Sequence, residues 1–258
     1  MQNLMVTLLF LTNTLVEQTH TINIYTEDLP LLQFVEKGEQ TGFAVELVKR
    51  IQAISGIRGV IYFYPWARAY KQAQGETNAL LFSTRKTQFR AKHFRWARAV
   101  FAPGYQTWYA TPELMLLCQH NSGIKITALA DAHKYSLIGQ RGDFLHEFAE
   151  YDLQWPLEKL VMARDFDDVL SMLSKGRGDL ILLAKQDYQE VLTTRGYRRD
   201  EFKVCHTLQS PDLPFYFAFS LRTEAQIIER FNQAYDSLLK NGEYRRLYAK
   251  WDKRAKAN

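Results

Sequence analysis

The side chains best suited to chemistry lie in one basic stretch, residues 83–98, directly after the apolar run 79–82. The stretch has no acidic residue, and its bases are Arg85, Lys86, Arg90, Lys92, Arg95 and Arg98. Guanidinium and ammonium groups at the end of a strand favour an anionic group of a ligand, and the hydroxyls of Ser83 and Thr87 could add hydrogen bonds. A solvated basic helix face is the alternative interpretation.

The elements that must position this stretch are alternating strands and helices. Alternating apolar and polar residues predict strands, and apolar residues at helical spacing before Gly56 predict a helix that ends there. The order βαβαβ favours parallel neighbouring strands. The strands are expected at 21–25, 60–64 and 79–82, and the helices at 44–54 and 65–74.

Ligands of such sheets bind beyond the carboxyl ends of the strands. Glu27, Trp66 and the segment 83–87 all follow predicted strands, so their loops are expected to converge on one place. For Trp66, burial in the core is the alternative, because large aromatic side chains after a strand are often simply packed.

A second α/β unit is expected after the segment 102–105, whose Pro and Gly interrupt the pattern. Asp143 is a suitable N-cap for a helix from Phe144 to about Tyr151. The chain then returns near 210–215 and ends in a long helix and a shorter partner helix. The unit's strands are expected at 135–139, from 161 and at 180–183, with a second helix at 165–173.

A family resemblance rests on five segments in the same order along the chain. Thr87 and Arg90, with Ser83 seven residues before the arginine, resemble the ligand-carboxylate motif of family 3 extracytoplasmic solute-binding proteins. In that family the motif has the form Thr-Pro-Glu-Arg, so only the Thr and the Arg match. The other similar segments are 25–30, 41–47, 176–179 and 241–251.

This resemblance implies the α/β type II periplasmic-binding-protein fold, with two lobes that close by hinge motion on a ligand. Each lobe would hold a mostly parallel sheet flanked by helices. The expected division is a signal peptide at 1–20, a first lobe at 21–102 plus 214–258, and a second lobe at 103–213.

Composition is that of a globular protein, because 47% of the 258 residues are hydrophobic. The net charge of +5 raises the possibility of nucleic-acid binding. However, 33 bases are mixed with 28 acids and no nucleic-acid motif is present, so we expect no such partner. The six histidines form no metal-binding pattern, so neither a metal nor a cofactor is expected.

The apolar run 4–11 has the length of a signal-peptide core and is too short to span a bilayer. It is an atypical signal, since no Lys or Arg precedes Lys37 and no small-x-small site follows, and a buried strand or helix is the alternative. Together with the resemblance, the run predicts export to the periplasm. No later apolar run is long enough for a transmembrane helix.

The only two cysteines, Cys118 and Cys205, fall in the same predicted lobe. An even count is compatible with a disulfide in an oxidising compartment. Free buried thiols are an equal alternative, because sequence separation does not show whether the Cα atoms approach.

The predicted function is capture of a small polar, anionic ligand between the lobes by a monomeric protein without enzymatic activity. The resemblance also implies delivery to a membrane ABC permease. The expected ligand-binding residues are Glu27, Trp66, Ser83, Arg85, Thr87, Arg90, Asp143 and Phe144.

A standard α-amino acid is not the expected ligand. The family places an Asp that holds the ligand ammonium where this chain has Ala184. It also places small hydroxyl residues where this chain has Asp143 and Phe144. These departures predict a larger or differently charged ligand.

Two other functions are compatible with the same fold. One is a sensory or partner-binding module. The other is a dehydratase acting on a cyclic carboxylic acid, in which Glu27 or Asp143 would serve as general acid or base. Substrate turnover would separate the dehydratase from a binding protein.

Overall fold

The computed structural model describes residues 20–108, 113–184, 192, 195–198, 200–209 and 214–256. Residues 1–19, which carry the expected signal segment, lie outside this part of the chain. Within the described part, no helix combines the length and the apolar character needed to cross a membrane.

The first sheet has the strand order β4-β1-β5-β12-β6. Its strands are β1 (Thr21–Thr26), β4 (Arg58–Phe63), β5 (Ala79–Arg85), β6 (Phe94–Ala99) and β12 (Phe215–Ser220). β1 pairs in parallel with β4 and with β5, which confirms the predicted βαβαβ unit. β12 is antiparallel to both β5 and β6. Strand β6 was not expected, because its aromatic and basic residues were interpreted only as part of the basic stretch.

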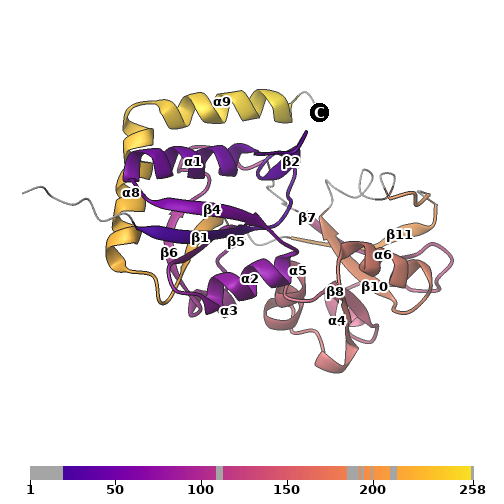
Figure 1. The fold of residues 1–258 in the computed structure, drawn as a ribbon. Helices are drawn as coiled ribbons and strands as arrows, with labels where there is room; N and C mark the ends of the chain where they lie inside the picture. Colours follow the sequence, from indigo (N-terminus) through magenta and orange to yellow (C-terminus); the bar gives the residue numbers. More distant parts are fainter. Residues whose placement is uncertain are drawn as a thin grey trace, which may run out of the picture.

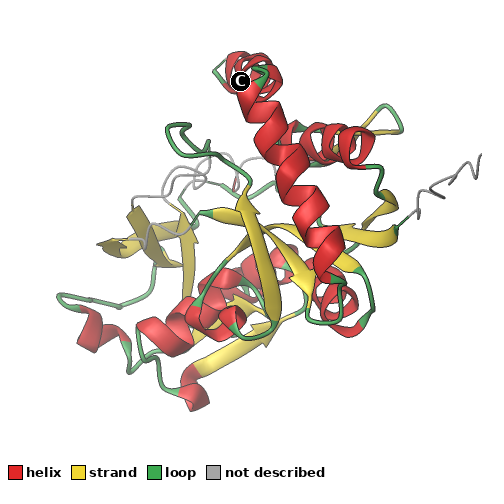
Figure 2. Cartoon of the chain, turned by 90° about the vertical axis from the view of Figure 1, so that its left-hand side faces the viewer, coloured by secondary structure: helices red, strands yellow, loops and turns green. Residues whose placement is uncertain are grey.

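Helices cover both faces of this sheet (Figures 1 and 2). Side chains alternate between the faces, so Ile22 and Ile24 pack toward α1 while Tyr25 packs toward α2. The helices are α1 (Phe43–Ser55), α8 (Ala225–Lys240) and α9 (Glu243–Ala255) on one side, and α2 (Trp66–Gly75) and α3 (Gln88–Ala91) on the other. A hairpin of β2 (Phe34–Glu36) and β3 (Glu39–Thr41) precedes α1.

Two helix predictions for this part are confirmed. Gly56 ends α1 in the left-handed conformation, with φ of 71°. The long helix expected near the end of the chain is α8, and its apolar face is buried, namely Ile227, Phe231, Ala234 and Leu238.

The second sheet has the order β11-β7-β10-β8-β9. Its strands are β7 (Glu113–Gln119), β8 (Leu137–Gln140), β9 (Leu160–Ala163), β10 (Leu180–Ala184) and β11 (Phe202–Gln209). β8, β9 and β10 are parallel, whereas β7 is antiparallel to its two neighbours. Each five-stranded sheet therefore combines parallel and antiparallel pairs.

Among the described residues, three α-helices accompany this sheet, α4 (Leu129–Ala132), α5 (Phe144–Glu147) and α6 (Phe166–Ser174). The single helix expected from Phe144 to Tyr151 is instead α5 followed by a π-helical turn, Phe148–Asp152. The wider turn closes with a hydrogen bond of 2.9 Å from the Leu153 amide to the Phe148 carbonyl.

The two cysteines form a disulfide between the neighbouring strands β7 and β11. The Cα atoms of Cys118 and Cys205 are 6.1 Å apart, within the usual range for a disulfide. Of the two alternatives left open by the sequence, the structure contains the disulfide.

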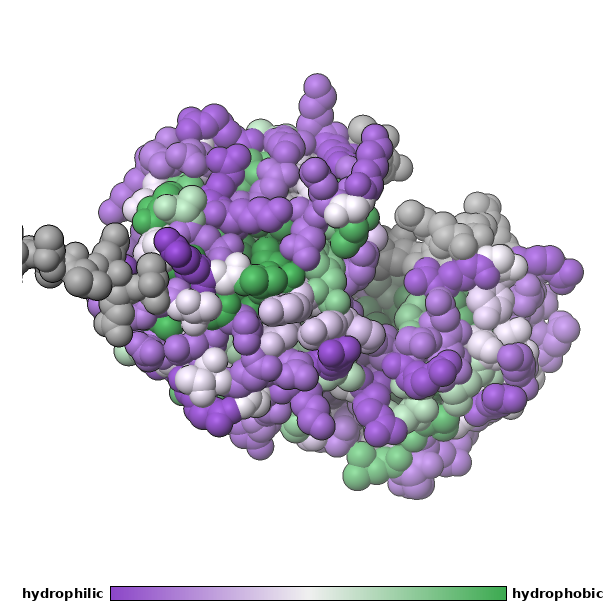
Figure 3. Space-filling model, in the orientation of Figure 1, coloured by the Kyte–Doolittle hydropathy of each residue, from purple (hydrophilic) through white to green (hydrophobic). Residues whose placement is uncertain are grey.

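The two sheets define two lobes. The chain leaves the first sheet after Ala99, enters the second at Glu113, leaves it after Gln209 and rejoins the first at Phe215. The space-filling view shows the surface hollowed between the lobes (Figure 3). The lobe boundaries predicted at 102 and 214 fall inside these two crossings and stay a prediction at the level of single residues.

Candidate functional site

A pocket of about 220 Å³ lies between the two lobes. A single water needs on the order of 10 to 15 Å³ by the same kind of measure, so the pocket has room for a small organic molecule. Seven of the predicted ligand-binding residues line it, namely Glu27, Trp66, Ser83, Arg85, Arg90, Asp143 and Phe144. The eighth, Thr87, is not part of the pocket wall.

The strand ends bring these side chains together. Glu27 follows β1, Trp66 opens α2 just after β4, and Arg85 is the last residue of β5. Asp143 caps α5, which follows β8 in the other lobe. Since parallel strands present their carboxyl ends at the same edge, the loops of both lobes meet at the pocket.

Ser83 holds a strained backbone conformation at this edge. Its φ of 58° lies in the left-handed region, which costs a non-glycine residue on the order of 1–3 kcal/mol. The side chain is buried and donates a hydrogen bond of 2.8 Å to the buried Gln33. Ser83 also lies where the pairing of β5 with β12 shifts register, so a bulge turns this residue.

Arg90 is 1% exposed, and protein groups use all of its guanidinium nitrogens. Nε lies 2.8 Å from the nearer carboxylate oxygen of Glu147 in the second lobe. Nη1 donates to the Thr84 hydroxyl and Nη2 to the Gly142 carbonyl, each at 3.1 Å. The sequence predicted a ligand anion on Arg90, whereas the structure gives this guanidinium a protein carboxylate.

Thr87 supports the same ion pair. Its hydroxyl accepts from the Arg90 amide at 3.1 Å as the N-cap of α3. It also donates to the Glu147 carboxylate at 3.1 Å. Thr87 therefore positions Arg90 and Glu147 rather than facing the pocket.

Glu147 was missed in the sequence analysis. It lies four residues after Asp143, a spacing that puts both carboxylates on one side of a helical turn. Its side chain is buried, and burial raises the pKa of the carboxyl while the nearby Arg90 opposes that shift. The spacing was the available signal, but it does not identify the partner.

Two further contacts bridge the lobes beside this pair. The Trp66 indole N–H donates to the carbonyl of Gly142, which also accepts from Arg90. Gly142 has a φ of 71°, which a residue without Cβ adopts at low cost. The rings of Phe89 and Tyr151 stack with centroids 5.2 Å apart.

Glu27 is the acidic group that projects into the pocket without a protein partner. Among the described residues its carboxylate makes no hydrogen bond or ion pair, although it lines the pocket. Burial, with smaller contributions from Asp143 and Asp28, raises its pKa to about 8 although Arg90 opposes the shift. A cation placed beside Glu27 would relieve this cost.

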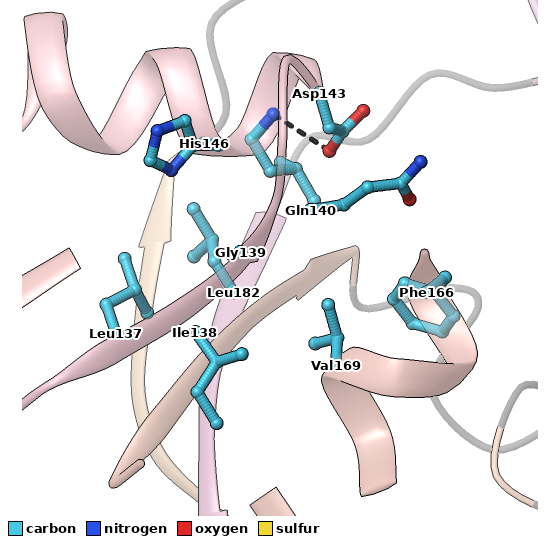
Figure 4. A pocket seen from close by; sticks show the side chains of 10 residues that line it. Leu137, Ile138, Gly139, Gln140, Asp143, His146, Phe166, Val169 and Leu182 are labelled. Carbon is cyan, nitrogen blue, oxygen red and sulfur yellow. Dashed lines mark hydrogen bonds between the residues drawn. The ribbon is translucent and has the colours of Figure 1, made fainter. Parts of the chain in front are cut away.

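Asp143 is partly satisfied by its own helix. Its carboxylate accepts from the Leu145 amide at 3.2 Å, drawn as the dashed line in Figure 4. Figure 4 also shows His146 beside Gly139, at a smaller pocket between α5 and α6. That second pocket measures only about 30 Å³, which suits water rather than an organic ligand.

The remaining walls are aromatic and aliphatic. The Arg85 guanidinium carbon lies 4.8 Å from the ring centroids of both Phe144 and Phe215, so the cation is held between the two rings. Trp66 closes another side. Further apolar wall residues are Leu29, Leu114, Leu145 and Ala184.

Ala184 ends β10 and lines the pocket, at the place where the family resemblance implies an Asp in amino-acid-binding proteins. The wall therefore has a methyl group at this place instead of a carboxylate. Asp187, a carboxylate nearby in the sequence, lies outside the described residues.

Replacing Glu27 with Gln is expected to stabilise the protein at high pH. The folded pKa of about 8 lies above the value of 4.5 for an unperturbed Glu, so the stability that the neutral carboxyl provides is full below pH 4.5. That stability is lost as the pH rises through about 8. At about pH 8.5 we expect Glu27→Gln to be more stable than the parent by roughly 1–2 kcal/mol, allowing for water that reaches this half-buried group.

Urea unfolding of both proteins at about pH 4.5 and about pH 8.5 measures this difference. The charged groups that face Glu27 are Asp143, Asp28 and Arg90, and they are common to both proteins. An equal difference in stability at the two pH values would show that Glu27 is not held in its neutral form.

Residues 22–254 match the family of bacterial extracellular solute-binding proteins, family 3. The comparison with curated protein sequences gives no match.

Solved structures share the fold. A histidine kinase sensor domain with similarity to periplasmic binding proteins is 19% identical with a TM-score of 0.65, and the match covers 90% of this chain and 96% of that one. An ancestral arginine-binding protein bound to arginine is 18% identical with a TM-score of 0.62, over 90% and 97% of the chains. The substrate-binding protein of an amino acid ABC transporter is 19% identical with a TM-score of 0.62, over 90% and 99%.

Proposed function

This chain belongs to the family 3 bacterial extracellular solute-binding proteins, and from that premise we propose that it captures one small polar solute in the pocket between its lobes. The observation that carries the proposal is the pocket itself. It has room for an organic molecule, and its charged and aromatic side chains come from both lobes. A solute that contacts both lobes would stabilise their closed arrangement.

The ligand is not a standard α-amino acid in this proposal. The support is Ala184 at the end of β10, which offers no charge to a ligand ammonium. A ligand carboxylate would also meet an occupied Arg90, since Glu147 already pairs with its guanidinium. An anionic ligand, as predicted from the basic stretch, would have to displace the Glu147 carboxylate.

The same proposal includes three further points: the protein binds its ligand without catalysis, it is a monomer, and it delivers the ligand to an ABC permease. Periplasmic location is supported by the family and by the disulfide between Cys118 and Cys205, because such bonds persist in oxidising compartments. A sensory module would use the same pocket. The dehydratase alternative would require turnover of a cyclic acid at Glu27 or Asp143.

A thermal-shift panel tests the proposed ligand class. The panel contains the twenty standard amino acids, organic acids, cyclic acids, short peptides and organic amines. A ligand at a hundred times its dissociation constant stabilises by about 2.7 kcal/mol, which is easily seen as a rise in Tm. We expect no standard amino acid to raise the Tm at micromolar concentration, and a clear rise with any of them would contradict this ligand class.

A further inference from the structure

We propose that Glu147 occupies the place of a ligand carboxylate on Arg90, and that the pocket therefore selects small organic amines or guanidines that lack a carboxylate. The cationic group of the ligand pairs with Glu27, and its apolar body lies against the aromatic wall. This inference rests on the proposed function and names the substrate class of the same pocket.

The positive charge of Arg90 is already paired with a protein carboxylate. Its Nε, Nη1 and Nη2 donate to Glu147, Thr84 and Gly142. The side chains of Arg90 and Glu147 are only 2% and 7% exposed, so water does not weaken their pairing. A ligand carboxylate would have to share the single Arg90 charge with the buried Glu147 carboxylate or displace it, and either is unfavourable.

The charges in and beside the pocket favour a cationic ligand. Among the described residues, Glu27, Asp143, Arg85 and Arg90 line the pocket, and Glu147 pairs with Arg90. When Glu27 is ionised, three negative groups stand against two positive groups, and this surplus of one negative charge favours a ligand with a single positive charge. A zwitterionic amino acid would not remove this surplus.

The carboxylates in and beside the pocket differ in whether they have a protein partner. Glu147 is paired with Arg90, and Asp143 accepts from the amide of its own helix. Glu27 lines the pocket and has no hydrogen bond or ion pair among the described residues. Its carboxylate is therefore the group that a ligand cation can reach.

The aromatic and aliphatic side chains of the pocket suit an apolar ligand body. Trp66, Phe144 and Phe215 line the pocket, together with aliphatic side chains. Aromatic faces attract both apolar groups and cations, so they suit an amine attached to an aromatic or aliphatic skeleton. The methyl group of Ala184 stands where a second cation partner would be needed for an α-amino acid.

Matched pairs that differ only by a carboxylate test this inference. We would titrate the intact protein with phenethylamine and phenylalanine, tyramine and tyrosine, and agmatine and arginine, using calorimetry at about pH 8. The tightest amine is expected to bind at least about tenfold better than its amino acid, because one charge-assisted pair is worth roughly ten- to a hundredfold in affinity.

Three variants assign the effect to residues. Glu27→Gln should weaken amine binding by roughly ten- to a hundredfold. The matched control is Asp28→Asn, which removes the neighbouring exposed carboxylate outside the pocket wall and should change affinity by less than about threefold. Glu147→Gln should reduce the preference for the amine over its amino acid by about tenfold or more, because Arg90 can then donate to and pair with a ligand carboxylate.

Proton release gives an independent readout. At pH 7 the carboxyl of Glu27 is largely protonated, since burial and the carboxylates of Asp143 and Asp28 outweigh the opposing Arg90 in setting its pKa. Binding of a cation must therefore release a proton, which calorimetry in two buffers of different ionisation enthalpy detects. Glu27→Gln should abolish this release.

The inference is overturned if each amino acid binds as well as its amine, if no amine binds, or if Glu27→Gln leaves amine affinity unchanged. Tight binding of an amino acid or an organic acid would overturn it while leaving solute capture intact. Loss of the proposed function itself would appear differently, as a pocket that takes up no small molecule of any class.

Discussion

Arg90→Met alone is expected to lower the free energy of unfolding by about 3–5 kcal/mol, whereas the double variant Arg90→Met with Glu147→Leu should recover most of that loss. The single change leaves the Glu147 carboxylate buried without its cation. The double change replaces both charges with apolar groups of similar size, which is often neutral. Urea unfolding gives the two stabilities, and the midpoints should differ clearly.

A surface pair serves as the control for this comparison. Nη2 of Arg98 lies 2.7 Å from Oδ2 of Asp236, but the two side chains are 48% and 37% exposed. Arg98→Met should therefore cost at most about 1 kcal/mol. If Arg90→Met costs no more than this control, or if the double variant is as unstable as the single one, the lobes are not held by a buried ion pair.

Removal of the disulfide is the second large expected effect. Cys118 and Cys205 are 87 positions apart in the sequence. A cross-link that closes a loop of this size lowers the entropy of the unfolded chain, which raises the free energy of unfolding by roughly 4–5 kcal/mol. The variant Cys118→Ala with Cys205→Ala should lose most of that stability in urea. The disulfide also joins the edge strand β11 to β7, so the loss falls on the second lobe.

The reducing agent supplies the control. With dithiothreitol present throughout unfolding, the parent protein should fall to nearly the stability of the double variant, because both then lack the cross-link. A parent whose unfolding midpoint is unaffected by the reductant, and equal to that of the variant, would contradict a stabilising disulfide.

Much of the pocket could be predicted because it follows from strand order. Glu27, Trp66 and Ser83 come just after or at the ends of parallel strands, and such ends converge whatever the side chains are. The hydrophobic periodicity that defines the strands is a local property of the sequence. The same reasoning identified Asp143 as the cap of α5.

The pairing of Arg90 with Glu147 could not be predicted in the same way. The two residues are 57 positions apart and belong to different lobes, so their contact depends on how the lobes are placed. The basic stretch predicts an anionic ligand group on Arg90, whereas in the structure the Glu147 carboxylate pairs with Arg90. Likewise, the disulfide required knowledge that β7 and β11 are neighbours, which spacing alone does not give.

Native mass spectrometry tests solute capture most directly. Protein purified without denaturation should carry one small molecule, released when the chain is unfolded, while Ala184→Phe should carry none because the larger side chain fills the pocket wall. Val60→Phe, at a surface position that is 59% exposed, should retain the molecule. A bound mass is expected in the parent and in Val60→Phe only. Identical bare masses for all three proteins, or a bound mass that survives Ala184→Phe, would contradict it.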